Sequence, residues 1–310
     1  MTILKLKGRA RWLRDLPSQA ALAVLNERRV RLWLGKRHRA AVTRHAHRLP
    51  DLDAIGNDVV AQLNRKGVCV TTLDALRIHG AAEVVDAAWQ LSSHFAPEAR
   101  ALARDGRQFI IVPLQIVRNP DIYRLGLHER LLDIVESYIG LPVAYDGVAI
   151  NYTVADGLEI ATRKWHRDRE DRRMLKVAIY LHDVDEEGGP FQCIARQDTV
   201  RSDIDGYHYE FGEDPLLKAR LGPDYADDVV SCTGLKGTVV FCDTARFFHR
   251  GKPATGRDRA ALFYSYFANP PRHPFLCERS GIDRSEALQM IEGLPDRQRR
   301  AALWRRRSPR

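Results

Sequence analysis

Apolar and polar positions alternate along the chain with two different periods. From residue 143 to 268, short apolar runs follow one another, several of them alternating as strands do, and Gly, Pro and Asp/Asn turns separate them. The predicted strands are VAINYTV (148–154), LKVAIYL (175–181), FQCIA (191–195), VVSC (229–232), GTVVFC (237–242), RFFHRG (246–251) and AALFYSYFA (260–268). This spacing is typical of an all-β sandwich or barrel.

Helical patterns flank this β region on both sides. Residues 18–46 predict one helix, or two helices broken near Gly35, and "RLPDLDAIG" then indicates a linker in which Pro50 stops the helix. Further helices are predicted over 53–67, about 80–104 and 126–139, and Gly67 and Gly140 are placed to end the first and the last of these. Helices return in the last 30 residues. We therefore expect an α+β protein with a helical N-terminal extension (1–51), a main domain (52–270, β core 143–268) and a helical C-terminal tail (271–310).

Composition agrees with a globular protein. The chain has 310 residues, of which 45% are hydrophobic, so it can bury a sizeable core. It contains no apolar run of about 18 residues and no secretory signal at its start, and we expect it in the cytoplasm. The five cysteines are scattered without a C-x-x-C pair, which argues against a disulfide framework and a structural zinc site.

Positive charge is concentrated at the ends of the chain. The net charge is +9, but residues 1–48 carry 13 Lys/Arg and 2 Asp/Glu, so the remaining 262 residues sum to −2. The tail "RQRRAALWRRRSPR" is basic again. The basic N-terminal segment could contact an acidic partner, an anionic membrane or a nucleic acid, although no specific nucleic-acid motif accompanies it. The alternative is a solvated basic helix.

A pair of possible metal ligands lies in the stretch "WHRDRED". His166 and Asp168 are two residues apart, so in an extended chain both side chains point to the same side. Non-haem Fe(II) oxygenases bind their metal through two histidines and one carboxylate on one face and leave the other positions open. His249 in "FFHRGKPA", 83 residues later, is the candidate third ligand.

An arginine follows the third candidate ligand by ten residues. Arg259 begins the strand "RAALFYSYF", and an arginine beside a metal can hold a carboxylate through two parallel hydrogen bonds. A co-substrate with a metal-chelating keto acid and a distal carboxylate requires such a contact. Arg257 is the rival, but it falls in the "TGRD" turn, whereas Arg259 is contiguous with the apolar strand.

Taken in order, these segments resemble a known family. The motifs "WHRDRED", "LKVAIYLHDVDEEGGPF", "LKGTVVFCDTARFFHRG" and "RDRAALFYSYF" are similar to those of the phytanoyl-CoA dioxygenase family of Fe(II)- and 2-oxoglutarate-dependent oxygenases, over roughly residues 55 to 270. One segment departs from the pattern. After the G-P turn the family commonly has a strand ending in P-G-S-H, where this chain has "FQCIARQDT", so the substrates of relatives do not carry over.

The resemblance implies a fold, cofactors and a reaction. It implies a double-stranded β-helix (jelly roll) in which His166, Asp168 and His249 bind Fe(II) and Arg259 binds the distal carboxylate of 2-oxoglutarate. With O2, such a site hydroxylates an unactivated C–H bond of a small-molecule substrate. Halogenating relatives have a small residue in place of the carboxylate ligand, so the presence of Asp168 favours hydroxylation over chlorination.

Two other classes of protein remain open. The first is a catalytically idle barrel that binds a ligand or a partner, with the basic helices as its docking surface; the complete ligand set argues against it. The second is a cupin-like metalloenzyme that does not use 2-oxoglutarate. Arg259 argues against the second class, because such an enzyme needs no carboxylate clamp.

Strand positions next to the ligands supply further candidates. In "LKVAIYL" we expect Leu175, Val177, Ile179 and Leu181 to pack under helices, and Lys176, Ala178 and Tyr180 to face the barrel interior. A lysine inside a barrel must meet a carboxylate, which could belong to 2-oxoglutarate, to the substrate or to the protein. Tyr180 is a candidate substrate contact. Asn151 or Tyr152, on an earlier strand, could bind the keto acid, and core or turn roles stay equally open.

Basic residues crowd the segment around the proposed ligands. They are Arg163, Lys164, Arg167, Arg169, Arg172 and Arg173, and three acidic residues offset only part of their charge. A positive mouth would favour an anionic substrate, with Arg172 and Arg173 as its expected contacts. The alternative is a set of surface salt bridges of little energetic value.

Overall fold

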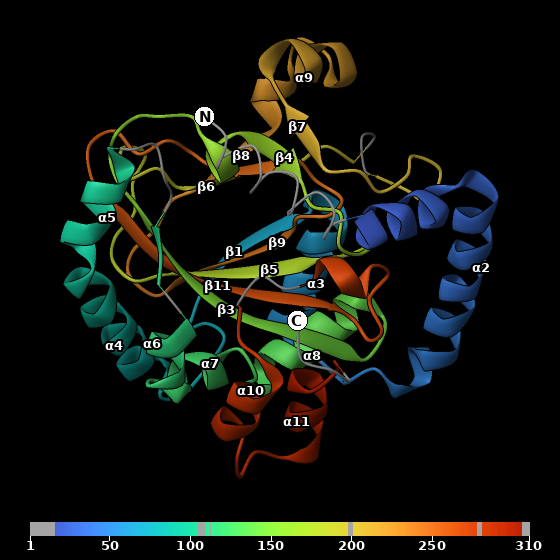
Figure 1. Cartoon of the computed structure of the whole chain (residues 1–310), viewed down its shortest axis with the longest axis horizontal. Coiled ribbons are helices and arrows are strands. Elements are labelled where there is room, and N and C mark those ends of the chain that lie inside the picture. Colours follow the sequence, from blue (N-terminus) through green and yellow to red (C-terminus); the bar gives the residue numbers. More distant parts are fainter. Residues whose placement is uncertain (1–15, 105–108, 112, 198–200, 278–280, 306–310) are drawn as a thin grey trace.

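The β-strands form two antiparallel sheets that enclose a common interior (Figure 1). The computed structural model describes residues 16–104, 109–111, 113–197, 201–277 and 281–305. The larger sheet has the order β1-β9-β5-β11-β3-β2 and the smaller one the order β7-β4-β10-β6-β8. The strands are β1 (Val68–Thr72), β2 (Phe109–Ile110), β3 (Val143–Thr153), β4 (Trp165–Arg167), β5 (Leu175–Tyr180), β6 (Phe191–Ile194), β7 (Glu210–Gly212), β8 (Val229–Cys232), β9 (Thr238–Asp243), β10 (His249–Gly251) and β11 (Arg259–Ala268). This is the expected α+β architecture with a double-stranded β-helix at its centre.

The two faces of the larger sheet pack against different layers. On β5, Leu175, Val177 and Ile179 belong to the large core that the helices cover. Ala178 and Tyr180 belong to a second core, between the two sheets. Side chains of a strand alternate between its faces, so the predicted division of this strand is confirmed.

Helices cover the outer face of the larger sheet (Figure 1). Those in contact with its strands are α3 (Ala54–Lys66), α4 (Ala81–His94), α5 (Ala96–Ala103), α7 (Pro120–Leu125), α8 (Glu129–Ile139) and α11 (Asp296–Ala302). The helices α6 (Pro113–Val117) and α10 (Arg284–Met290) pack on α7, and α9 (Asp214–Leu221) lies apart, beside β7. The left-handed residues Gly67 and Gly140 end α3 and α8 as predicted. The helix predicted over 80–104 is instead two helices that meet at Phe95. Pro97 lies in the first turn of α5, and a proline there lacks the N–H that would continue the helix from α4.

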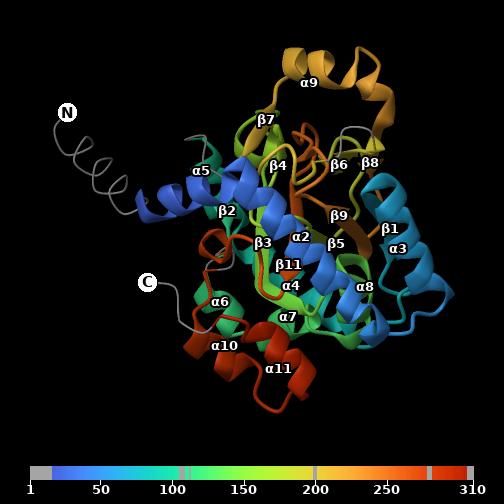
Figure 2. The same cartoon turned by 90° about the vertical axis from the view of Figure 1, so that its right-hand side faces the viewer.

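The N-terminal helical region differs from its prediction in the position of the break. Residues 16–26 are helical, and α2 (Arg28–His45) follows and crosses one side of the molecule (Figure 2). The break falls at Glu27, whose carboxylate accepts hydrogen bonds from the N–H groups of Arg29 and Val30 and so begins a new helix. Gly35 stays helical. A Cβ at Gly35 would lie 2.2 Å from Oδ2 of Asp203, so this glycine allows a close contact and does not end the helix.

Among the described residues, no helix combines the length and the apolar character needed to cross a membrane. The helices α10 and α11 pack near the C-terminal end (Figure 1). Arg297 of α11 donates hydrogen bonds to Glu129, Asp133 and Glu136 of α8 and thereby joins the tail to the main body.

Candidate metal centre

His166, Asp168 and His249 come together inside the barrel. Strand pairing brings His249 of β10 directly opposite His166 of β4, and Asp168 follows two residues later on the same side of the chain. One possible ligand atom from each side chain lies within 4.8 Å of the others, and the two imidazole rings are 4.2 Å apart between centroids. The three side chains are almost fully buried, with exposed fractions of 1–2%. Sequence spacing and strand register therefore bring the three predicted ligands to one point.

The hydrogen bonds of the two histidines fit metal ligation. Nδ1 of His166 lies 2.7 Å from the carbonyl oxygen of Lys164, and Nδ1 of His249 lies 3.3 Å from that of Phe247. A carbonyl can only accept, so each Nδ1 carries the proton and each Nε2 keeps its lone pair. Nε2 of His249 is buried and makes no hydrogen bond to any described residue. The arrangement suits a cation that accepts two imidazole nitrogens and one carboxylate.

Burial also keeps His249 in the form that binds a metal. The pKa of His249 is well below its usual value, chiefly because burial disfavours the charged ring and secondly because His166 is close, while Asp168 acts in the opposite direction. The imidazole is therefore neutral at physiological pH.

Lys176 of β5 meets the carboxylate of the cluster. Its Nζ lies 2.7 Å from Oδ2 of Asp168. From the sequence we expect a carboxylate partner for Lys176, from 2-oxoglutarate, the substrate or the protein. Among the described residues that partner is Asp168, one of the proposed metal ligands.

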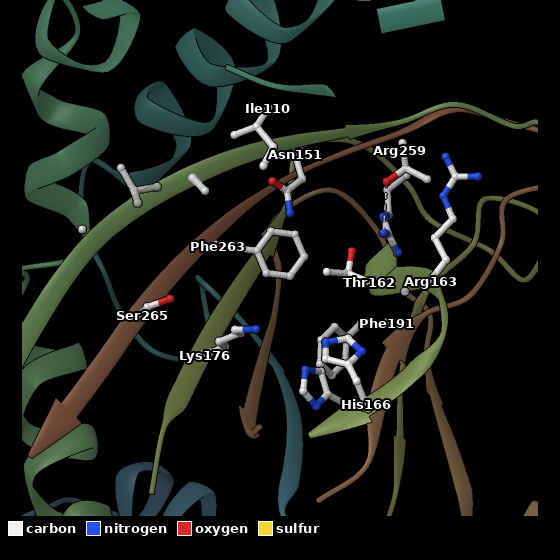
Figure 3. Close-up of a pocket in the computed structure, with 16 residues that line it drawn as sticks. Ile110, Asn151, Thr162, Arg163, His166, Lys176, Phe191, Arg259, Phe263 and Ser265 are labelled. Carbon is white, nitrogen blue, oxygen red and sulfur yellow. Dashed lines mark hydrogen bonds between the residues drawn. The ribbon is translucent and has the colours of Figure 1, made fainter. Parts of the chain in front are cut away.

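A cavity of about 190 Å³ opens onto the cluster. Figure 3 shows Arg259, Arg163 and Thr162 at one end of it and Lys176 and Ser265 at the other, with the ring of Phe263 between. Its complete lining is Ile110, Gly147, Val148, Ala149, Asn151, Thr153, Thr162, Arg163, His166, Lys176, Phe191, His249, Gly251, Arg259, Phe263 and Ser265. The cavity can hold a small molecule beside the cluster.

Arg259 places a buried positive charge at one end of the cavity. Its guanidinium donates hydrogen bonds to the carbonyl of Gly189 and, over 3.3 Å, to Oγ1 of Thr153, and the residue is only 4% exposed. The ion pairs among the described residues include none to Arg259. Burial lowers its pKa from the usual arginine value. A buried guanidinium that faces a cavity without a carboxylate in its lining can bind an anionic group. The rival, Arg257, is exposed and pairs with Asp185.

The other predicted cofactor and substrate contacts divide into two groups. Asn151 lines the cavity, and its Oδ1 is buried without a hydrogen-bond partner among the described residues. Tyr152 points the other way, and its hydroxyl donates to Asp258. Tyr180 faces the space between the sheets, but its hydroxyl donates to the carbonyl of Cys232 and accepts from the N–H of Phe191, outside the cavity.

Arg172 and Arg173 lie away from the cavity. Arg172 pairs with Asp203, with 3.1 Å between Nε and Oδ1. Arg173 donates to the carbonyl of Tyr138 and stacks on that ring at 4.7 Å. Neither arginine lines the cavity beside the metal cluster.

Sequence reasoning did not place Thr153, Arg163 or Gly251 in the cavity, although Arg163 is one of the basic residues around the proposed ligands. Thr153 binds Arg259 and lies two residues after Asn151, so the alternation of the strand could have identified it. Arg163 is 4% exposed and pairs with Asp156. Gly251 lies so close to Arg259 that a Cβ would be 2.8 Å from Nη2. No local signal marks the last two.

Comparisons with known proteins give no family. No family model matches the chain, and no curated protein matches it. Among solved structures, EctD from S. alaskensis with bound Fe is 19% identical with a TM-score of 0.49, covering 72% of this chain and 81% of that one. The non-heme alpha ketoglutarate dependent carbocyclase SnoK from nogalamycin biosynthesis is 17% identical with a TM-score of 0.47, covering 71% and 85%. Likenesses at TM-scores below 0.5 are too slight to carry an argument about function.

The fold and the buried cluster define a class of protein on their own evidence. The chain is a double-stranded β-helix protein with a candidate mononuclear metal site of two histidines and one aspartate. Membership of the phytanoyl-CoA dioxygenase family stays a prediction from the motifs.

Proposed function

We propose that this protein is an Fe(II)- and 2-oxoglutarate-dependent oxygenase that hydroxylates a C–H bond of a small molecule. The observation that carries the proposal is the pairing of two features in one cavity: the buried cluster of His166, Asp168 and His249, and the buried guanidinium of Arg259, which has no carboxylate partner among the described residues. A metal alone does not call for such an arginine. A co-substrate that chelates the metal at one end and carries a carboxylate at the other does.

Each side chain has a definite part in this proposal. His166 and His249 offer Nε2, because their Nδ1 protons are held by carbonyl groups. Asp168 offers carboxylate oxygen, and Arg259 binds the far carboxylate of 2-oxoglutarate. Fe(II) held by the two histidines and Asp168 would supply the oxidation chemistry. With O2, a C–H bond of the substrate would become C–OH while 2-oxoglutarate becomes succinate and CO2.

The remaining cavity wall would hold and orient the substrate. Phe263 and Ile110 provide apolar contact. Asn151 and Ser265 provide polar groups, and Asn151 or Lys176 can also reach the keto-acid end of 2-oxoglutarate. An anionic substrate stays a prediction. Its expected contacts Arg172 and Arg173 are paired outside the cavity, whereas Arg163 lines it.

The experiment needs no knowledge of the substrate. Purified protein is loaded with Fe(II) without oxygen and titrated with 2-oxoglutarate, and the weak visible charge-transfer band of the chelate is recorded. We expect a saturable band that is lost in His249→Ala. In Arg259→Ala we expect 2-oxoglutarate to bind about 10- to 100-fold more weakly, the usual cost of losing hydrogen bonds to a charged group.

Arg257→Ala is the matched control. It removes an arginine two residues away that is exposed and paired with Asp185, and its titration should match that of the unaltered protein. A folded, metal-loaded protein without the band would contradict the proposal and favour a cupin-like metalloenzyme. A folded protein that binds no metal would favour the idle barrel.

A further inference from the structure

The chain segment 201–209 lies between the metal centre and the N-terminal helices. It leads directly into β7, which pairs with β4 so that Phe211 lies opposite His166. Its other side faces Asn26, at the end of the 16–26 helix, and Arg31 and Arg39 of α2. The segment therefore connects the N-terminal extension with β4, the strand that carries His166, and with Asp168 just beyond that strand.

On the metal side, two residues of the segment contact the cluster. The guanidinium of Arg201, whose side chain has no exposed surface, donates to the carbonyl of Asp168 and, over 2.8 Å, to the carbonyl of His208. Glu210 lies 3.8 Å from this guanidinium and also pairs with Arg167 and Arg220. The ring of Tyr209 stacks on the imidazole of His166 at 5.7 Å between centroids and 29° between planes. The segment thus restrains the backbone of one proposed ligand and the ring of another.

On the other side, the N-terminal helices hold the backbone of the segment. The amide of Asn26 both accepts from the N–H of Tyr207 (2.9 Å) and donates to its carbonyl (3.1 Å), as a neighbouring strand would. Arg31 is 8% exposed and donates to the carbonyl of Ile204 over 3.0 Å. These contacts span more than 170 positions of sequence and come from two separate helices.

Asp203 adds a third point of attachment. Its carboxylate rests against Gly35 of α2, where any Cβ would collide with it. The same carboxylate accepts from the hydroxyl of Tyr207 over 2.7 Å and pairs with Arg172 over 3.1 Å. Since buried or half-buried polar groups with matched partners fix a single arrangement, the segment has little freedom to move while α2 is in place.

We propose that Asn26 and Arg31 are positioning residues of the metal centre: by holding residues 203–207 they fix Arg201 against Asp168 and Tyr209 against His166. This inference rests on the proposed function, because it requires that the cluster bind a metal. The N-terminal helices then contribute to metal affinity. This role is separate from any contact between their basic residues and a partner.

The expected effect follows from how metal sites respond to their surroundings. Losing a group that directly orients a ligand typically costs 10- to 100-fold in metal affinity. Asn26 and Arg31 act one step further away, so we expect their loss to weaken metal binding by roughly three- to tenfold. The reason is that the ligands then sample more orientations, which binding must restrict again.

The test uses the full chain and Co(II) as a spectroscopic metal, with no substrate and no 2-oxoglutarate. The dissociation constant of Co(II) is measured for Arg31→Met and for Lys36→Met. Both changes remove one positive charge and keep a good helix former in α2, but Lys36 is exposed and Arg31 holds Ile204. We expect weaker binding in Arg31→Met only, with recovery in Arg31→Lys, which can still donate a hydrogen bond. Asn26→Ala provides an independent variant should Arg31→Met fail to fold.

A purely structural role would lower the stability of these variants without changing Co(II) affinity in the folded state. Folded Arg31→Met and Asn26→Ala that bind Co(II) within twofold of the unaltered protein would overturn the inference. Absence of Co(II) binding in the unaltered protein would overturn the proposed function and this inference with it, so the two failures are distinguishable.

A double-mutant cycle tests the route through the segment. If Arg31 acts through Arg201, the losses of affinity in Arg31→Met and Arg201→Met overlap, and the double variant loses less than the product of the two. Fully independent losses would contradict this route.

Discussion

Nζ of Lys176 lies 2.7 Å from Oδ2 of Asp168, and the two side chains are 10% and 1% exposed. A lysine therefore neutralises the carboxylate of the candidate metal cluster when no metal is bound. A divalent cation bound by Asp168 would take over that role and weaken the attraction between the two side chains. The lysine thereby offsets the cost of burying the Asp168 carboxylate.

The first prediction concerns Lys176→Met. This change leaves the carboxylate of Asp168 buried without this cation, and breaking a buried pair from one side costs roughly 3 kcal/mol. We expect the free energy of unfolding of the metal-free protein to fall by about that amount in urea titrations. Added Co(II) should restore more stability to the variant than it gives the unaltered protein, because it removes a larger electrostatic penalty.

Lys218→Met is the matched control for this effect. Lys218 also pairs with an aspartate at 2.7 Å, but both side chains are more than half exposed. Exposed pairs contribute about 0.5 kcal/mol or less. Equal losses in the two variants, or equal stabilisation by Co(II), would show that the contact of Lys176 has no special electrostatic role.

The second prediction concerns Gly251, which lies against the guanidinium of Arg259. A Cβ at this position would be 2.8 Å from Nη2, so Gly251→Ala must displace the guanidinium. Because Arg259 is held by Gly189 and Thr153, we expect the displacement to weaken 2-oxoglutarate binding about tenfold, as for a lost charge-assisted hydrogen bond, and to leave Co(II) affinity unchanged. Both quantities are measured by titration.

Gly188→Ala serves as the control for Gly251→Ala. A Cβ at Gly188 would approach no atom closer than 3.4 Å, which is an ordinary contact, and binding should stay the same. A parallel loss of Co(II) affinity in Gly251→Ala would instead indicate a general distortion of β10, the strand that carries His249.

Local periodicity accounts for the parts of this protein that could be predicted from sequence. The separation of His166 and Asp168 by two residues in an extended strand determines that they share a side, and an alternating strand divides Lys176 from its apolar neighbours in the same way. The position of Arg259 at the start of a strand is also local information. These relationships depend on backbone geometry over a few residues, so they hold once the strands form.

The parts that could not be predicted depend on partners far away in the chain. Arg172 turns to Asp203, 31 residues later, and Arg173 turns to the carbonyl of Tyr138, 35 residues earlier. Gly35 lies inside a helix, where it allows Asp203 to pack closely. The many basic residues near the proposed metal ligands predicted a positively charged entrance for the substrate. Arg172 and Arg173 instead bind partners that are distant in sequence, which no local pattern reveals.

The last prediction concerns the pH dependence of stability and His273. This histidine is fully buried, its Nδ1 lies 2.7 Å from the carbonyl of Arg169, and its ring packs edge-on against Tyr207. Burial, followed by the nearby Arg272 and Arg172, lowers its pKa to about 4, whereas the carbonyl of Arg169 acts in the opposite direction.

The sign of the effect follows from comparing the folded and unfolded chains. Between pH 6.5 and 4 the unfolded chain binds a proton at His273 and the folded chain does not, so stability falls as the pH falls through this window and is unaffected above it. At pH 5 this histidine should lower the free energy of unfolding by about 2 kcal/mol relative to pH 7.

In His273→Asn, the loss of unfolding free energy of the metal-free protein between pH 7 and pH 5 should therefore be smaller by about that amount, whatever the variant costs at pH 7. Replacement of the exposed His79 by asparagine is the matched control. A His273→Asn protein whose stability falls with pH as steeply as that of the unaltered chain would show that the buried ring is already protonated in the fold, with Arg169 as its acceptor.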